Sequence, residues 1–193
     1  MTTSNGSIMV ILSSPSGAGK TTLTKKIQQK YQNCKISVSH TTRKPRSNEV
    51  EGIDYFFVSH EEFKKKITNN EFYEYAKIFD NYYGTSKNSV NSLLKNNNDI
   101  LFDIDWQGTK QLTKFKELQL IKIFLIPPTK KELKNRLIQR NQDKPDVITK
   151  RLKAYDNDIF HWSDYDHIII NDNLENCFLQ IEKIILSSKL DNL

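Results

Sequence analysis

Residues 13–22 combine small side chains, hydroxyl groups and a lysine in an order that could hold a chain of phosphates. Gly19, Lys20 and Thr21 match the second half of the pattern G-x-x-x-x-G-K-[ST], and Ser14 stands where its first glycine is expected. In such a loop the backbone N–H groups surround the anion, the lysine reaches the outer phosphates and the hydroxyl binds Mg²⁺. The predicted nucleoside triphosphate site comprises Ser14, Pro15, Ser16, Gly17, Ala18, Gly19, Lys20, Thr21 and Thr22.

Two acidic residues, Asp103 and Asp105, follow an apolar run at the end of a predicted buried strand over residues 100–105. The carboxyl ends of parallel strands form the edge where open α/β sheets bind ligands. One carboxylate there can hold water on a magnesium ion, and the other can face a second substrate. The alternative is that they only end the strand and cap the helix that begins near residue 107.

The arginines fall into two groups. Arg43 and Arg46 flank a proline in a stiff turn, so they could present two planar forks to one phosphomonoester; a solvated basic loop is the alternative. Arg136 and Arg140 are spaced i, i+4 on one helix face, and Arg151 lies beyond a polar loop. This trio could close over a triphosphate and neutralise the transferring group, although ordinary exposed arginines would show the same spacing.

These residues need elements that hold them in place. An apolar strand over residues 8–12 precedes the phosphate loop, and Leu23, Ile27 and Tyr31 recur at helical spacing after it. That context favours the phosphate loop over an ordinary Gly/Ser connection. Other strands are expected at 35–40, 55–58, 72–76, 82–85, 100–105, 120–126 and 167–170, and other helices at 61–67, 86–95, 133–140 and from 172 or 173 to the end.

Strands that alternate with helices predict a doubly wound α/β fold with a parallel sheet, and 193 residues favour a single domain. The 37% hydrophobic content is scattered in short runs, which predicts a soluble, cytoplasmic protein without a membrane span. The net charge of +6 is spread along helices, as on solvated faces, so nucleic-acid binding is the less favoured partner class. Cys34 and Cys177 lack metal-ligand spacing and are expected to be reduced.

Four segments, 37–46, 49–55, 81–85 and 103–108, resemble those of guanylate kinases in order and spacing, and the resemblance covers nearly the whole chain. It implies ATP-dependent phosphorylation of GMP and dGMP in purine nucleotide metabolism. It also implies a P-loop NTPase-type parallel sheet flanked by helices, with a small β-rich GMP-binding insert and a helical lid. The single domain would divide into a core at about 1–38, 88–128 and 152–193, an insert at about 39–87 and a lid at about 129–151.

The resemblance also assigns roles to individual residues. The GMP phosphate would be held by Arg43, Arg46, Tyr55 and Tyr83. The guanine base would be read by Ser39, Glu74 and Thr85, with Asp105 adding to recognition. Asn171 would contact the adenine of ATP, and Mg²⁺, the implied cofactor, would bind Thr21 and Asp103, directly or through water. The catalytic groups would be Lys20, Arg43, Asp103, Arg136, Arg140 and Arg151.

The chain departs from the family pattern at three places: Ser14 replaces the first P-loop glycine, Asn141 replaces a glycine after the second lid arginine, and residues 144–146 are less acidic than usual. None of these changes removes a charged group that phosphoryl transfer needs. A catalytically inactive guanylate-kinase-like module that binds protein partners is the alternative function. Bacterial relatives imply a possible homodimer.

Overall fold

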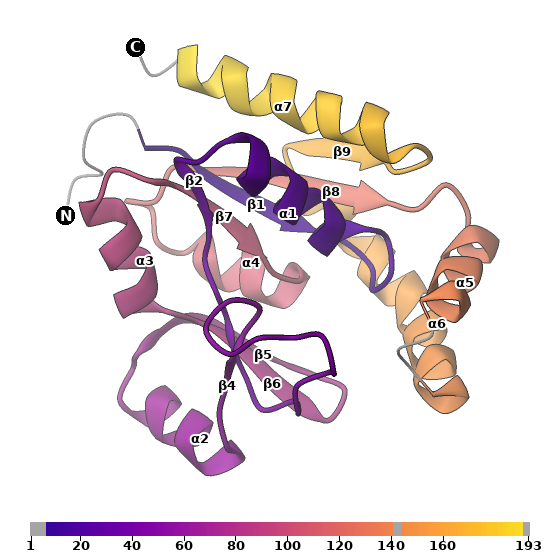
Figure 1. The fold of residues 1–193 in the computed structure, drawn as a ribbon, viewed down its shortest axis with the longest axis horizontal. Coiled ribbons are helices and arrows are strands. Elements are labelled where there is room, and N and C mark those ends of the chain that lie inside the picture. The colour runs from indigo at the N-terminus through magenta and orange to yellow at the C-terminus, as the bar shows by residue number, and fades with distance from the viewer. Residues whose placement is uncertain (1–6, 141–143, 191–193) are drawn as a thin grey trace.

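The computed structural model describes residues 7–140 and 144–190. Its larger sheet is parallel throughout and has the strand order β2-β7-β1-β8-β9 (Figure 1). The strands are β1 Met9–Ser13, β2 Cys34–Ile36, β7 Asp99–Asp103, β8 Leu120–Ile126 and β9 His167–Ile170. The central strands are apolar runs without alternation because both faces of the sheet are covered, and this confirms the predicted α/β fold class.

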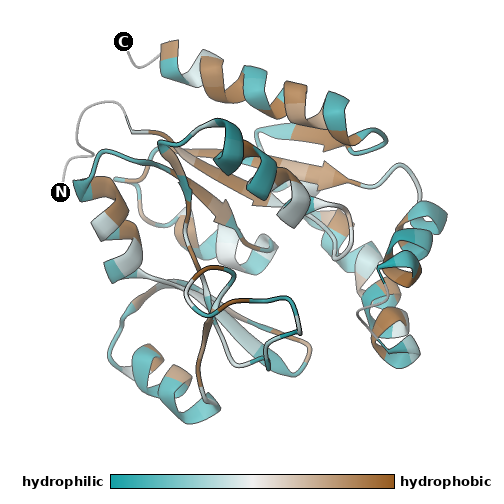
Figure 2. Cartoon of the chain, viewed as in Figure 1, coloured by the Kyte–Doolittle hydropathy of each residue, from teal (hydrophilic) through white to brown (hydrophobic). Residues whose placement is uncertain are grey.

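Helices α1 (Lys20–Lys30) and α7 (Leu174–Leu190) cover one face of this sheet, and α3 (Lys87–Lys95) and α4 (Trp106–Leu112) cover the other (Figure 1). Alternate residues of the central strands point to the two faces, so one strand contributes to two hydrophobic clusters. Val10 of β1 packs toward α1 and α7, whereas Ile11 packs on the opposite side. Figure 2 shows the apolar strands between helices that carry both hydrophilic and hydrophobic residues.

A smaller sheet of four strands, in the order β4-β3-β6-β5, projects below the parallel sheet (Figure 1). Its elements are β3 His40–Thr41, β4 Phe56–Phe57, β5 Phe72–Ile78, β6 Asn81–Ser86 and the helix α2 His60–Thr68. Its core is aromatic: the Phe63 ring of α2 stacks on Phe72 and Tyr82, with centroid distances of 4.6 Å and 5.4 Å. A few rings and short strands therefore support the region in which the acceptor nucleotide was expected.

Two helices, α5 (Lys130–Gln139) and α6 (Pro145–Phe160), stand beside the opening between the two sheets (Figure 1), and a short 3₁₀ helix (His161–Asp164) follows them. Pro145 is the first residue of α6, where a missing N–H costs nothing. Asn141, which stands where the family pattern has a glycine, lies outside the described residues. Within the described ranges, no helix has the length and apolar character needed to cross a membrane.

The structure corrects two predicted strands. The strand expected at 35–40 is divided between the sheets, because the chain leaves β7 after Ser37 donates its N–H to Leu101 O at 3.0 Å. Apolar and polar residues do alternate over residues 35–40, but this stretch contains parts of two short strands that lie in different sheets. The strand expected at 100–105 ends at Asp103. Asp105 instead follows the strand and caps α4 by accepting the Gly108 N–H at 3.0 Å, as the helix-cap alternative expected.

Candidate active site

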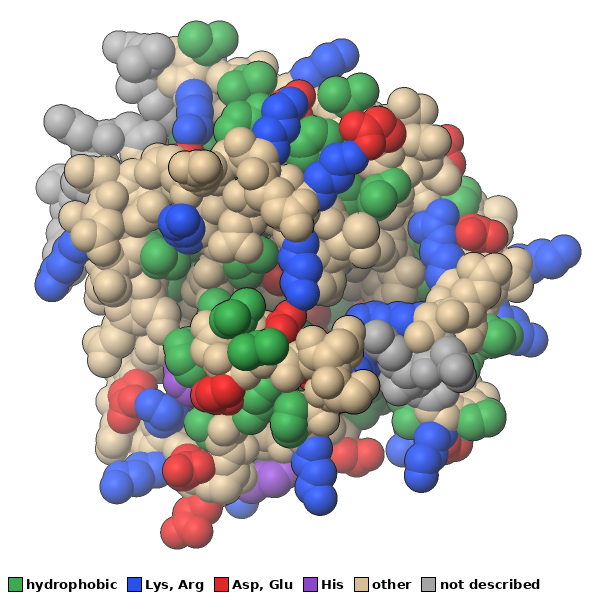
Figure 3. Space-filling view, in the orientation of Figure 1, with side chains coloured by type: hydrophobic (Ala, Val, Ile, Leu, Met, Phe, Trp, Pro, Cys, Tyr) green, Lys and Arg blue, Asp and Glu red, His purple; other side chains and the backbone are tan. Residues whose placement is uncertain are grey.

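A cleft of about 1130 Å³ opens between the carboxyl edge of the parallel sheet, the smaller sheet and the helices α5 and α6. Figure 3 shows the surface hollowed there, with Lys and Arg side chains beside the hollow. Single-ligand clefts are usually about 300–1,000 Å³, so this one has room for more than one small molecule. The predicted site residues that line it are Ser14, Pro15, Ser16, Gly17, Gly19, Lys20, Thr21, Thr22, Ser39, Arg43, Arg46, Tyr55, Glu74, Tyr83, Asp103, Asp105, Arg136, Arg140 and Arg151.

Three predicted residues, Ala18, Thr85 and Asn171, are buried and do not line the cleft. Asn171 is 3% exposed, and its amide Nδ2 donates to Ala18 O at 2.7 Å. A Cβ on Gly19 would collide with the same amide nitrogen. The position of Asn171 therefore gives no support to the predicted adenine contact; instead, its side chain fixes the backbone of the phosphate loop.

The loop conformation explains why a serine is tolerated at position 14. Positive φ angles occur at Gly17 (95°) and Gly19 (99°), but not at Ser14. A left-handed backbone conformation disfavours a Cβ, and Ser14 does not adopt one, so it introduces no strain of this kind. Its hydroxyl donates to Pro15 O at 3.0 Å. The first departure from the family pattern leaves the loop geometry intact.

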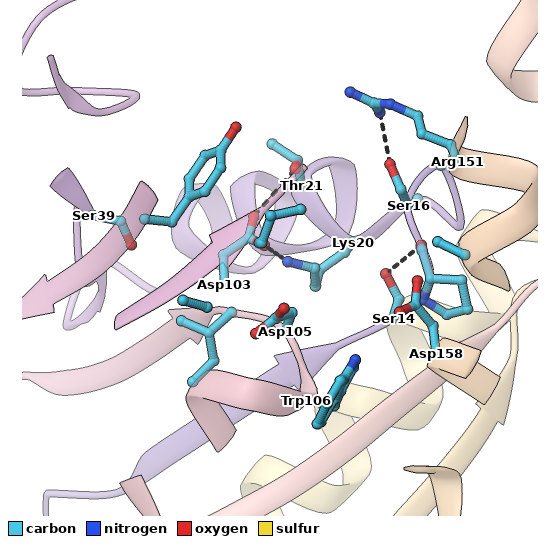
Figure 4. A pocket seen from close by; sticks show the side chains of 18 of the residues that line it. Ser14, Ser16, Lys20, Thr21, Ser39, Asp103, Asp105, Trp106, Arg151 and Asp158 are labelled. Carbon is cyan, nitrogen blue, oxygen red and sulfur yellow. Dashed lines mark hydrogen bonds and ion pairs between the residues drawn. The ribbon is translucent and has the colours of Figure 1, made fainter. Parts of the chain in front are cut away.

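Lys20 and Thr21, the first residues of α1, both meet Asp103 at the end of β7 (Figure 4). Lys20 Nζ donates to Oδ1, and Thr21 Oγ1 donates to Oδ2 at 3.1 Å. The parallel pairing of β1 with β7, in which Leu12 is opposite Asp103, brings the phosphate loop to this carboxylate. The predicted pairing of phosphate loop and acidic strand end is therefore a direct contact.

This corner suits a hard cation. Thr21 and Asp103 supply oxygen atoms beside the phosphate loop, and the described residues contain no cluster of three or more His, Cys, Asp or Glu that could enclose a metal by themselves. Mg²⁺ is typically held by one or two protein oxygens together with phosphate and water. The residues present therefore fit magnesium that arrives with a nucleotide.

Glu49 lies between the two arginines that were expected to hold a phosphate, and the Arg46 guanidinium Nη1 is 3.5 Å from Glu49 Oε1. Arg43 Nη2 donates to Glu49 Oε1 at 2.7 Å, and the backbone N–H of Arg46 donates to Oε2 at 2.8 Å. Burial alone would raise the pKa of Glu49, but the hydrogen bonds from Arg43 and Arg46 outweigh it and lower that pKa. The Arg43 guanidinium also lies over the Tyr55 ring, 5.3 Å from its centroid. An internal carboxylate thus keeps these cations in place, a role that the sequence did not reveal.

Glu74 lies on the cleft-facing side of β5 and is 3% exposed. It is paired with Thr85 of β6, which is fully buried. Burial raises the pKa of Glu74 to about 7, and the nearby charge of Asp105 contributes in the same direction. A ligand that offers two N–H donors would favour the ionised carboxylate and stabilise it in this position.

The three arginines of α5 and α6 reach the cleft from one side. Arg151 Nη1 donates to Ser16 Oγ of the phosphate loop at 2.6 Å (Figure 4). Arg136 Nε donates to Glu132 one turn earlier in α5, at 3.0 Å. Arg140 is the C-cap of α5 and also lines the cleft. Positive charge therefore surrounds the region between the phosphate loop and the smaller sheet.

The sequence singled out neither Trp106 nor Asp158 as a site residue. The Trp106 ring stacks on His161, with centroids 3.7 Å apart and planes at 11°, and joins α4 to the end of α6. Asp158 of α6 also lines the cleft near Trp106 (Figure 4), and burial, followed by the charge of Asp105, raises its pKa to about 6. The stacking of Trp106 on His161 holds α6, which carries Arg151, against α4, which Asp105 caps.

Comparison with known proteins gives one consistent result. The family model described as Guanylate kinase matches residues 7–188. Proteins named Guanylate kinase from Novosphingobium aromaticivorans and Rickettsia bellii are 43% and 44% identical, over 95% and 97% of this chain and 83% and 97% of theirs. A crystal structure of guanylate kinase from Anaplasma phagocytophilum superposes with a TM-score of 0.79 at 32% identity, over 96% of this chain and 87% of that one.

A more distant likeness concerns the fold alone. The SH3-kinase fragment of tight junction protein 3 matches with a TM-score of 0.52 at 9% identity, over 98% of this chain and 60% of that one. The TM-score and the identity are both lower than those of the Anaplasma structure.

Proposed function

This chain belongs to the guanylate kinase family, and we propose that it transfers the γ-phosphoryl group of ATP to GMP or dGMP, giving ADP and the nucleoside diphosphate. The observation that carries the proposal is a single cleft with two different halves. One half joins the phosphate loop to Asp103, and the other contains an arginine clamp and the buried carboxylate of Glu74.

The acceptor phosphate binds at the clamp of Arg43 and Arg46, with Tyr55 and Tyr83 beside it. The Arg43 guanidinium hydrogen-bonds Glu49 and the Arg46 guanidinium forms an ion pair with it at 3.5 Å, and this supports the assignment, because cations that bind a carboxylate also bind a phosphate oxygen. A phosphate carries more charge than a carboxylate and displaces Glu49 or shares its partners. The clamp is thus prepared before the substrate arrives.

The guanine base is selected by Glu74, assisted by Ser39, Thr85 and Asp105. Guanine presents N1–H and N2–H as a pair of donors, which one carboxylate can accept together, whereas adenine presents an acceptor at N1. The burial of Glu74 supports this role, because a ligand that leaves a buried carboxylate unpaired is rejected strongly.

In the transfer, an oxygen of the GMP phosphate attacks the γ-phosphorus of ATP, and the bond from that phosphorus to the bridging oxygen of ADP breaks. No side chain becomes covalently modified, so catalysis depends on positioning and charge neutralisation. Lys20 and the phosphate-loop N–H groups hold the donor phosphates, and Arg43, Arg136, Arg140 and Arg151 neutralise the two anions. The Arg151–Ser16 hydrogen bond supports the placement of that cation at the phosphate loop.

Mg²⁺ would be held by Thr21 and Asp103, directly or through water, and when bound it would neutralise the outer phosphates. We further propose that the insert, about residues 39–87, and the lid, about residues 129–151, close over the core, about 1–38, 88–128 and 152–193, to exclude water. An ion pair between Lys150 of α6 and Asp80 of the insert, at 3.6 Å, supports their approach across the cleft.

The other expectations follow from this function. The inactive protein-binding module is not favoured, because Lys20, Asp103 and the arginines converge on the cleft and the curated relatives are named as enzymes. Nucleic-acid binding gains no support from the arginines, because both arginine groups line the nucleotide cleft. A cytoplasmic location and a homodimer remain predictions from the sequence and the resemblance.

Coupled measurement of ADP formation with GMP, AMP, CMP and UMP as acceptors tests the proposal. We expect turnover with GMP and much slower turnover with the other three. Equal activity with AMP would remove the role assigned to Glu74, and no activity with any monophosphate would remove the proposed function.

A further inference from the structure

Gly108 lies in the first turn of α4, and its backbone gives no reason for a glycine. Its N–H donates to the capping carboxylate of Asp105, as that of any residue but proline would. Positive φ angles occur at Gly17, Gly19 and Gly52 but not at Gly108. Glycine within a helix is less stable than alanine. Something outside the helix must therefore account for the absence of a side chain.

The space beside Gly108 is filled by the carboxylate of Glu74. A Cβ on Gly108 would lie 2.5 Å from Glu74 Oε2, 3.0 Å from Cδ and 3.4 Å from Cγ. The three nearest atoms thus all belong to one side chain, and the nearest is well inside ordinary contact distance. Gly84 differs, because a Cβ there would meet the Glu74 backbone oxygen and the side chains of Phe63 and Tyr75.

The backbones of β5 and α4 are held together next to this contact. Gln111 of α4 accepts the Tyr75 N–H at 3.1 Å and donates its amide to Tyr75 O at 2.6 Å. Tyr75 directly follows Glu74, so the strand cannot retreat without breaking both hydrogen bonds. A side chain at position 108 would consequently be accommodated by moving the carboxylate end of Glu74, which is buried.

We propose that Gly108 is a positioning residue for acceptor selection: its missing side chain lets the Glu74 carboxylate rest against α4 in the position that meets the guanine edge. This inference rests on the proposed function, since it takes Glu74 to be the group that reads the base. Replacement by alanine would displace the carboxylate by about 1 Å, a shift that can cost on the order of 10- to 100-fold when it misaligns a bound group.

The first test is Gly108→Ala with Lys110→Ala, an exposed position of the same helix, as the control. We expect KM for GMP to rise about 10-fold or more in Gly108→Ala, with kcat and KM for ATP changed by less than about 3-fold. The melting temperature should not fall, because alanine favours the helix and the obstacle is only a side-chain end. Lys110→Ala should behave as the wild type.

A double-mutant cycle separates positioning from general damage. Glu74→Asp withdraws the carboxylate by one methylene and leaves room for a Cβ, so adding Gly108→Ala to that variant should change KM for GMP by less than about 3-fold. The inference would be overturned if Gly108→Ala left KM for GMP unchanged or failed to fold. It would also be overturned if the effects of the two substitutions on KM for GMP were additive. A wild-type protein without GMP kinase activity would instead overturn the proposed function.

Discussion

The two halves of the cleft are built in different ways. The donor half is one continuous segment, residues 14–22, that follows the buried strand β1 and includes the first turn of α1. The acceptor half consists of side chains from several separate segments, including Arg43, Glu74 and Tyr83. The donor half rests on the two large hydrophobic clusters of the parallel sheet, whereas the acceptor half rests on a small aromatic core.

This difference separates turnover from selection. In the proposed mechanism, backbone groups and Lys20 bind phosphates, which all nucleotides share, so the donor half would support transfer without choosing a base. The acceptor half keeps an ionisable group, Glu74, nearly out of solvent, where its pKa rises to about 7. Burial of this carboxylate lowers the stability of the protein. It also makes a ligand that leaves the carboxylate unpaired bind poorly, and the site can thereby discriminate between bases. Substitutions in the two halves should therefore affect different kinetic constants.

The largest effect is expected from Lys20→Ala. Loss of the ammonium group beside Asp103 should lower kcat on the order of 10²- to 10³-fold, because it removes charge stabilisation from the transferring group. The dissociation constant for GMP should stay close to that of the wild type. Steady-state kinetics and calorimetry measure the two quantities, and Lys64→Ala on the exposed side of α2 is the control. If turnover falls by less than about 10-fold, the donor half is wrongly assigned.

Glu74→Gln should affect selection instead. The amide cannot accept both guanine donors, so kcat/KM for GMP should fall on the order of 10²-fold while kcat/KM for AMP changes little. The pKa of Glu74 is raised from 4.5 to about 7 on folding, so its ionisation destabilises the protein as the pH rises through this range. Glutamine removes that cost, and the variant should be at least as stable at pH 8. Retained preference for GMP over AMP would contradict the role of Glu74.

A smaller effect is expected from pH. If the ionised form of Glu74 binds the guanine donors, as we propose, lowering the pH from about 8 to about 6 should weaken GMP binding by about 10-fold through this group. The phosphate of GMP also titrates in this range. Glu74→Gln shares that ligand titration and lacks the carboxylate, so the difference between the two calorimetric pH profiles isolates Glu74. Parallel profiles would show that its protonation is not linked to binding.

The smallest effect is expected where the two regions meet. Asp80→Asn removes the 3.6 Å ion pair between the insert and Lys150 of α6, whose side chains are both more than half exposed. Exposed ion pairs contribute little, so kcat and both KM values should change by less than about 2-fold, with less dependence on salt. A larger loss would mean that closure depends on this contact rather than on the bound nucleotides.

Predictability from the sequence follows the same division. Gly19, Lys20 and Thr21 are adjacent in the chain, and their order, with the apolar strand before them and the helical pattern after them, predicted the loop that the structure contains. Residues 100–105 also identified the strand that brings Asp103 to the loop, although its end was placed two residues too late. Where function depends on local backbone geometry, a pattern in one segment was sufficient.

In the acceptor half, the arginine turn was predicted from its own pattern, whereas the role of Glu74 depended on the family resemblance, because its contacts join residues far apart in the chain. No local pattern shows that Glu74 meets Gly108, or that Asn171 binds the phosphate-loop carbonyl of Ala18. Glu49 follows Arg43 by only six residues, but its hydrogen bonds depend on how the turn folds back. These contacts require tertiary structure, and the adenine contact that the resemblance assigns to Asn171 stays a prediction beside the observed bond to Ala18.

A crystal structure with GMP bound tests the central claim most directly, because it locates both ends of the acceptor at once. We predict that both Glu74 carboxylate oxygens will accept from the guanine N1–H and N2–H groups. The phosphate should lie between Arg43, Arg46, Tyr55 and Tyr83, with Glu49 displaced or sharing its partners. A guanine edge that faces away from Glu74, or a GMP phosphate bound in the loop of Gly17 to Thr21, would contradict the division of the cleft into donor and acceptor halves.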